Sequence, residues 1–160
     1  MKKLILILLL FFVSNVYSQI DIKPFEEFTG KWEGIYEVGG EKNKEILINS
    51  LFHKNMFFRM DVSGEMVKNS SLKYSESAIF TINDNDEIIG WGFGEDGYKG
   101  IVNFKGKMVE NKVILSGNCT YYTLDLSYEI KDSKLIRKSK YIFKDSPDNP
   151  SIVECIYTKK

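Results

Sequence analysis

The sequence predicts an all-β fold: an antiparallel up-and-down meander that closes into a β-barrel of about ten strands. Apolar and polar residues alternate with period two along most of residues 30–160, so successive side chains face opposite sides of a sheet. Turn residues recur at hairpin spacing, and few residues remain for helix. The outward positions are strongly polar, which fits an antiparallel sheet with one wet face.

Residues 1–18 have the pattern of a secretory signal peptide. Lys2 and Lys3 form a positive segment, residues 4–13 are apolar, and Ser18 is a small residue before Gln19. We expect cleavage after Ser18, a bacterial source, and export to the periplasm or out of the cell. The apolar run is shorter than the roughly 20 residues that span a bilayer, so no membrane span is expected in the mature chain.

The remaining residues 19–160 have the length of one barrel domain. Removing Lys2 and Lys3 from the 22 basic residues leaves 20 against 22 acidic residues, a formal net charge of −2. Nucleic acids and anionic membranes both require a concentrated basic face. We therefore expect neither as a partner.

The elements follow in order from turn chemistry. Pro24 predicts a short helical turn within residues 21–28, whose two phenylalanines would plug one end of the barrel. Strands then alternate with turns predicted at Gly39-Gly40, residues 53–55, 83–86 and 95–97, Lys105-Gly106, and residues 131–133 and 145–150.

Strand parity assigns an inner face to each predicted strand. The assigned inner residues are Trp32, Gly34, Tyr36 and Val38; Met56, Phe58, Met60 and Val62; Leu72, Tyr74, Glu76, Ala78, Phe80 and Ile82; Ile89, Trp91 and Phe93; Tyr98, Gly100, Val102 and Phe104; Tyr122, Leu124, Leu126, Tyr128 and Ile130; Leu135, Arg137, Ser139, Tyr141 and Phe143.

The segment Phe28-Thr29-Gly30-Lys31-Trp32 resembles the Gly-x-Trp start of the calycins, the group of lipocalins and fatty-acid-binding proteins. The chain is most similar to small exported bacterial lipocalin-like proteins of unknown function. The resemblance implies a lipocalin-like barrel, with Gly30 and Trp32 as structural motif residues. It also implies that Trp32 packs under an arginine from a late strand, for which Arg137 is the candidate by position.

Arg137 is the first candidate binding residue, because a guanidinium inside a barrel needs an anionic or aromatic partner. A ligand carboxylate would suit its planar fork of donors, as in fatty-acid carriers. The alternative is a structural role, with Arg137 stacked on Trp32.

Glu76 is the second candidate, because its carboxylate falls on an otherwise apolar strand face. If buried, it would either pair with Arg137 or act as a general acid or base. A β-bulge that turns it outward is a further alternative.

The sequence has few other residues that could catalyse a reaction or bind a metal or cofactor. His53 is the one histidine, and it lies in a predicted hairpin turn, so neither a Ser-His-Asp arrangement nor a histidine-ligated haem is expected. No metal site and no cofactor are predicted. Cys119 and Cys155 would either form a disulfide, which export permits, or remain two small buried thiols if a strand separates them.

Three functions remain open. The first is an exported barrel that binds a small apolar or amphipathic molecule. The second is a non-enzymatic scaffold or protein-interaction barrel with a filled interior, which would meet its partner through Ile35, Phe57, Ile101 and Ile142. The third is a barrel enzyme, such as an isomerase, that uses Glu76. The first has a predicted ligand-binding set of Arg137, Glu76, Trp91, Tyr98, Tyr128 and Tyr141.

Overall fold

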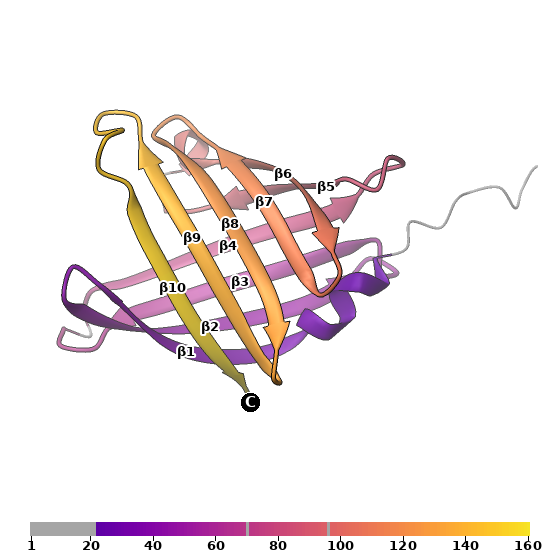
Figure 1. The fold of residues 1–160 in the computed structure, drawn as a ribbon, viewed down its shortest axis with the longest axis horizontal. Helices are drawn as coiled ribbons and strands as arrows, with labels where there is room; N and C mark the ends of the chain where they lie inside the picture. Colours follow the sequence, from indigo (N-terminus) through magenta and orange to yellow (C-terminus); the bar gives the residue numbers. More distant parts are fainter. Residues whose placement is uncertain (1–21, 70, 96) are drawn as a thin grey trace, which may run out of the picture.

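The computed structural model describes residues 22–69, 71–95 and 97–160. They form a closed barrel of ten antiparallel strands in which each strand pairs with its neighbours in sequence and β1 pairs with β10. In Figure 1, β8–β10 cross in front of β1–β4. The predicted meander barrel is therefore confirmed, whereas the predicted signal peptide lies outside the described residues.

The elements are the 3-10 helix η1 (Lys23–Phe28), strands β1 (Gly30–Val38), β2 (Glu41–Phe52), β3 (Phe57–Met66), β4 (Lys73–Ile82) and β5 (Ile88–Phe93), the 3-10 helix η2 (Gly97–Gly100), and strands β6 (Val102–Val109), β7 (Lys112–Asn118), β8 (Tyr122–Lys131), β9 (Lys134–Phe143) and β10 (Ser151–Lys159). Within the described ranges, no helix is long and apolar enough to cross a membrane.

Six of the seven predicted turns lie between strands, whereas the turns between β3 and β4, β6 and β7, and β7 and β8 were not predicted. Gly39 and Gly40 have φ of 60° and 78°, the left-handed values that glycine adopts without strain, and they join β1 to β2. The turn predicted at Lys105-Gly106 is wrong, because both residues lie within β6 and the chain turns at Glu110 instead. A Cβ on Gly106 would lie 2.0 Å from the carbonyl oxygen of Ile114, so this glycine permits a close approach of two strands rather than a turn.

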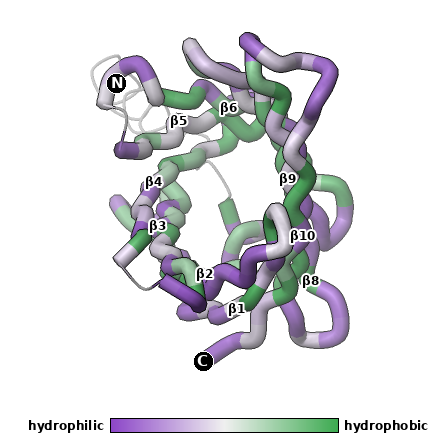
Figure 2. The backbone as a smooth tube through the Cα atoms, turned by 90° about the vertical axis from the view of Figure 1, so that its left-hand side faces the viewer, coloured by the Kyte–Doolittle hydropathy of each residue, from purple (hydrophilic) through white to green (hydrophobic). Residues whose placement is uncertain are grey.

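The predicted inner faces hold for most strands, and Figure 2 shows hydrophobic and hydrophilic residues alternating around the ring. The prediction for β5 is wrong. Gly90 and Gly92 point inward, where the rings of Phe80 and Phe104 lie against them, and Trp91 points outward with 40 % of its surface exposed. The parity argument failed because it assigned the inner face to the largest apolar side chains, and here the inner face is glycine.

Tyr98 is also misplaced by the sequence prediction. It lies in η2, outside any strand, and is 80 % exposed. The period-two argument does not extend across a 3-10 turn, because such a turn has about three residues per repeat. The inward row begins at Gly100, the last residue of η2, and continues at Val102.

Helix η1 closes one end of the barrel, as the sequence predicted. Phe25 stacks on Phe58 with 4.6 Å between ring centroids, and Phe28 is buried beside it. The carbonyl oxygen of Phe28 accepts hydrogen bonds from Trp32 Nε1 and Asn49 Nδ2, both at 3.0 Å, which fasten the helix to β1 and β2. We call this the closed end. The opposite end, where β1–β2, β3–β4, β5–β6, β7–β8 and β9–β10 are connected, is called the far end.

Candidate functional site

A glutamate lies on the inner face of β2, between two glycines on the neighbouring strands. Glu45 is in register with Gly34 on β1 and Gly64 on β3. Two tyrosine rings occupy the space that the missing side chains leave. A Cβ on Gly64 would lie 2.2 Å from Tyr74, and one on Gly34 would lie 2.8 Å from Tyr157. The two glycines therefore allow the tyrosine rings to lie over the sheet and reach the carboxylate.

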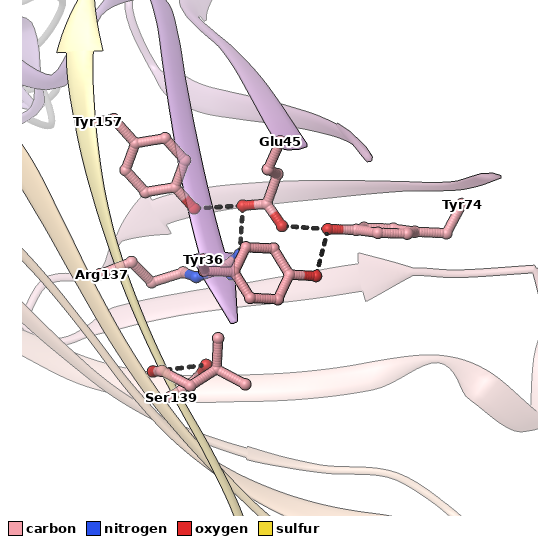
Figure 3. A network of polar contacts seen from close by, with 7 residues as sticks. Tyr36, Glu45, Tyr74, Arg137, Ser139 and Tyr157 are labelled. Atoms are coloured by element: carbon pink, nitrogen blue, oxygen red, sulfur yellow. Dashed lines mark hydrogen bonds and ion pairs between the residues drawn. The ribbon is translucent and has the colours of Figure 1, made fainter. Parts of the chain in front are cut away.

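The Glu45 carboxylate is 1 % exposed and is held by three donors (Figure 3). Arg137 Nη1 donates to Oε1 at 2.6 Å, and the Tyr157 hydroxyl donates to the same oxygen. The Tyr74 hydroxyl donates to Oε2. Because the Tyr74 proton is committed to Glu45, the hydroxyl of Tyr36 donates to Tyr74 at 2.9 Å. We call these five residues the interior polar network.

Arg137 completes this network from β9. Its guanidinium carbon lies 5.5 Å from the ring centroid of Tyr36 and 5.8 Å from that of Tyr157, within the range of cation–π attraction. Burial disfavours its charged form, but Tyr157 and Glu45 outweigh burial and hold the pKa of Arg137 above its usual value. Arg137 therefore stays charged, and Nη1 is tied to Glu45.

The tyrosines of the network stay protonated in the folded protein. Burial raises the pKa of Tyr74 and Tyr157 far above the usual value, and the Glu45 charge raises both further. Protonated hydroxyls are the donors that a buried carboxylate requires. The charges of the network therefore balance, because the Glu45 anion is paired with the Arg137 cation. Both carboxylate oxygens of Glu45 also accept hydrogen bonds.

One donor atom of Arg137, Nε, takes no part in these hydrogen bonds. Nε is buried and has no hydrogen-bond partner among the described residues. A buried N–H donor without a partner costs free energy, on the order of 1–3 kcal/mol. Arg137 also lines an interior cavity, so this donor belongs to a side chain that a small molecule in the barrel can contact.

The interior cavity has a volume of about 60 Å³. One water needs about 10–15 Å³ by this measure, so the space corresponds to roughly four to six water-sized groups. Its charged lining residues are Arg137 and Glu76, and its polar aromatic ones are Tyr122, Tyr128 and Tyr141. The apolar part of the wall includes Met60, Val62, Ala78, Phe80, Val102, Phe104, Leu124 and Leu126.

Aromatic side chains gather where this cavity meets the far end. The Tyr122 ring packs edge-on against Tyr141 at 5.5 Å and against Phe143 at 5.9 Å, measured between centroids. Burial raises the pKa of Tyr141 to about 12, with a contribution from the Glu76 charge. Burial, with a smaller contribution from the same carboxylate, also raises the pKa of Tyr122. Glu76 lines the same cavity as these phenols, although its own side chain is exposed to solvent.

The structure brings together four of the six predicted ligand-binding residues. Arg137, Tyr128, Tyr141 and Glu76 all line the cavity. Trp91 and Tyr98 do not, for the reasons given above. Glu76 keeps the inward parity of β4, in register with Val62, so no bulge turns it away. Its exposure removes the burial on which the general acid or base hypothesis was founded.

The expected stacking of Arg137 on Trp32 is wrong. Arg137 lies over Tyr36 and Tyr157, and the cation over Trp32 is Lys159 Nζ, 5.1 Å from the ring centroid. The reason is register, because Trp32 pairs with Lys159 across β1 and β10 near the closed end, whereas Arg137 pairs with Cys155 further toward the far end.

Cys119 and Cys155 are buried and free, so the disulfide alternative is not realised. Two strands, β8 and β9, separate the end of β7 from β10. Burial raises the pKa of the Cys155 thiol, which makes it a weak nucleophile.

Sequence reasoning missed Glu45, Tyr157 and the roles of Tyr36 and Tyr74. A signal for Glu45 existed, because Glu45, Leu47, Asn49 and Leu51 form one parity row of β2. That row was obscured because Ile46 and Ile48 on the opposite face are just as apolar. The glycine at position 64 on the neighbouring strand was the second available signal.

No protein-family description matches the chain, and neither does any curated protein. Several solved barrels are similar to it, among them the following three. The fluorescent protein UnaG has a TM-score of 0.47 at 18% identity, with 85% of this chain and 99% of that chain covered. A variant of UnaG has a TM-score of 0.49 at 17% identity, with 85% and 98% covered. A de novo designed fluorescence-activating β-barrel has a TM-score of 0.48 at 7% identity, with 88% and 100% covered.

Proposed function

We propose that this protein is an exported calycin-like barrel that binds a small amphipathic molecule in its interior cavity. The observation that carries the proposal is the buried Nε of Arg137, a donor without a partner among the described residues, on a side chain that lines the cavity. A ligand with a hydrogen-bond acceptor would satisfy this donor, and its apolar part would lie against the wall formed by Met60, Phe104 and Leu126.

The cavity sets the size of the ligand. A volume of about 60 Å³ accommodates a group of roughly four to six heavy atoms without rearrangement of the wall. The ligand is therefore a small molecule, or the end of a longer one that leaves the barrel at the far end beside Tyr122 and Tyr141.

Export is part of the proposal and is supported by Lys2, Lys3 and the apolar run that follows them. An exported binding barrel acts on molecules outside the cytoplasm, in the periplasm or beyond the cell. Protease protection of the protein in intact cells of its source would test this part separately.

Native mass spectrometry of the protein purified from its own source tests the binding proposal. We expect a non-covalent small-molecule adduct on the wild-type chain. Ala78→Leu would fill the cavity, because Ala78 lies on its wall between Met60 on β3 and Gly92 on β5. Val67→Leu, at an exposed position, is the matched control. An adduct that persists in Ala78→Leu, or its absence from the wild type, would contradict the proposal.

The alternative is a scaffold or protein-interaction barrel, and two features of the outer face favour it. Ile35 and Ile156 are in register on β1 and β10, and they are 62% and 49% exposed. A hollow of about 740 Å³ also lies on the outer face, lined by Ile114, Ile152 and the stems of Lys105, Lys107, Lys138 and Lys140. This reading predicts that Ile35→Ser abolishes capture of a partner, whereas Ala78→Leu leaves it unchanged.

A further inference from the structure

The interior cavity has one positive charge on its wall, and that charge is already neutralised. Arg137 is the one cation among the described residues that line this cavity. Its Nη1 lies 2.6 Å from Glu45 Oε1, and the two side chains are only 9% and 1% exposed. The buried pair therefore carries no net charge. A ligand group beside Arg137 meets a hydrogen-bond donor without a net positive charge.

One donor of Arg137 remains for a ligand after the ion pair has formed. The guanidinium is planar, and its N–H groups point in fixed directions. Glu45 is bound at Nη1, whereas Nε is buried and has no partner within the described part of the chain. An acceptor at Nε thus leaves the hydrogen bond at Nη1 in place. The interior polar network and a ligand can share Arg137.

A carboxylate is a poor acceptor for this donor. It would place a second anion on the guanidinium that already balances Glu45, and like charges at one site repel. It would also lose its hydration inside the barrel, with no second cation among the described wall residues to compensate. A neutral oxygen accepts the same hydrogen bond at a much smaller desolvation cost. The charge balance of the site therefore favours an uncharged acceptor.

We infer that the ligand presents an uncharged oxygen, a carbonyl or hydroxyl group, to Arg137 Nε, and that it is a neutral amphipathic molecule rather than a carboxylic acid. This inference rests on the proposed function and names its ligand class. It replaces the ligand carboxylate that Arg137 suggested in the sequence, because the charge of this arginine is already balanced by Glu45.

A matched pair of probes tests the inference. Methyl propyl ketone and butyrate share a propyl chain on a carbonyl carbon and have the same number of heavy atoms. Butyrate is ionised at neutral pH, as a glutamate is. Each would be titrated into the protein while the Met60 methyl group, on the cavity wall, is followed by NMR. We expect the ketone to bind at least about tenfold more tightly than butyrate, because butyrate would add a second anion to the buried pair.

The Nε–H signals of the arginines report the predicted hydrogen bond directly. The sequence has two arginines, Arg59 and Arg137, so Arg59→Lys assigns both signals. Arg59 is the internal control, because its Nε already donates to Asp61 Oδ1 at 3.0 Å on the exposed surface. We expect the ketone to move the Arg137 Nε–H signal downfield, in step with the Met60 shift, and to leave the Arg59 signal in place.

Glu45→Gln removes the counter-charge of Arg137 and keeps an oxygen that can accept its hydrogen bond. The Arg137 charge is then uncompensated and attracts a carboxylate, so we expect the ratio of ketone affinity to butyrate affinity to fall at least about tenfold. Glu37→Gln, at an exposed position of β1 that does not line the cavity, is the control and should leave this ratio unchanged. If Glu45→Gln does not fold, the wild-type affinities decide.

The outcomes separate the inference from the proposed function. Butyrate binding as tightly as the ketone, an unshifted Arg137 Nε–H signal in the ketone complex, or an unchanged affinity ratio in folded Glu45→Gln would each overturn the inference. Binding in the cavity, followed at Met60, would still stand. Failure of both probes to shift the Met60 methyl signal would overturn the proposed function and the inference with it.

Discussion

The two ends of the barrel interior are built on different principles. At the closed end, Phe25 stacks on Phe58 and Phe28 packs edge-on against Phe25, so the side chains that fill this end are apolar. In the half nearer the far end, the interior holds a buried carboxylate, a buried guanidinium and three tyrosine hydroxyls. Burial of charge does not maximise stability, since a well-packed apolar core of the same volume would be as stable or more so. The closed end is therefore filled by apolar rings, whereas the polar half is arranged around one hydrogen-bonded ion pair.

A second contrast lies within the polar half. Glu45 is buried and receives three hydrogen bonds, whereas Glu76 is exposed at the cavity. Glu45 holds Arg137, which lines the cavity, whereas Glu76 lines the cavity itself and is exposed to solvent.

The largest effect is expected where the buried pair is broken. Glu45→Leu leaves the Arg137 charge buried without a counter-ion, and we expect a loss of about 4 kcal/mol in the free energy of unfolding, measured by urea denaturation. The double variant Glu45→Leu, Arg137→Met removes both charges and should recover most of that loss. A double variant as unstable as the single one would show that the pair itself is stabilising.

Truncation of the plug tests the closed end. Phe25→Ala should cost about 3 kcal/mol, because it removes a fully buried ring and leaves a cavity against Phe58. Phe93→Ala, at a position 43% exposed on β5, is the matched control and should cost far less. Equal losses in urea denaturation would mean that η1 contributes nothing specific to closure.

The glycine beside Glu45 offers a smaller test. Gly64→Ala places a Cβ where the Tyr74 ring lies, so the ring must move and its bond to Glu45 is lost. We expect a loss of about 2 kcal/mol. Gly94→Ala, which would meet no atom within 4 Å, should be nearly neutral. If Gly64→Ala proves as mild as Gly94→Ala, the ring and the glycine are not coupled.

Alkaline pH tests the tyrosines. Their pKa values are raised on folding, so above about pH 10 the unfolded chain loses phenol protons that the folded chain keeps. The stability they contribute is complete below pH 10 and falls as pH rises, by about 1.4 kcal/mol per pH unit for each such tyrosine. Tyr157→Phe should reduce this slope by one tyrosine, as measured by urea denaturation from pH 9 to 11. An unchanged slope would contradict the burial of the Tyr157 hydroxyl.

The smallest effect concerns the thiols. Both cysteines should react with a thiol reagent only after unfolding, and the unfolded protein should titrate two thiols without a reductant. Detection of fewer than two would indicate a disulfide.

Strand alternation was sufficient to predict the barrel, its strand number and most inner faces, because period two is imposed by the pleat itself. It failed where the inner face is glycine, as at Gly90 and Gly92, and where both faces are apolar, as around Ile46. The candidate site was half predicted for the same reason. Arg137 and Glu76 stood out on their strands, but the partner of Arg137 depends on the register between β2 and strands far away in sequence.

The proposed function requires that small molecules enter the cavity in the polar half of the barrel. The most direct measurement is NMR of the methionine methyl groups during a titration with n-butanol. We expect a saturable shift of the Met60 signal, no comparable shift of the exposed Met56, and loss of the Met60 response in Ala78→Leu. A Met60 signal that stays fixed at saturating butanol, or one that still shifts in Ala78→Leu, would contradict the proposed function.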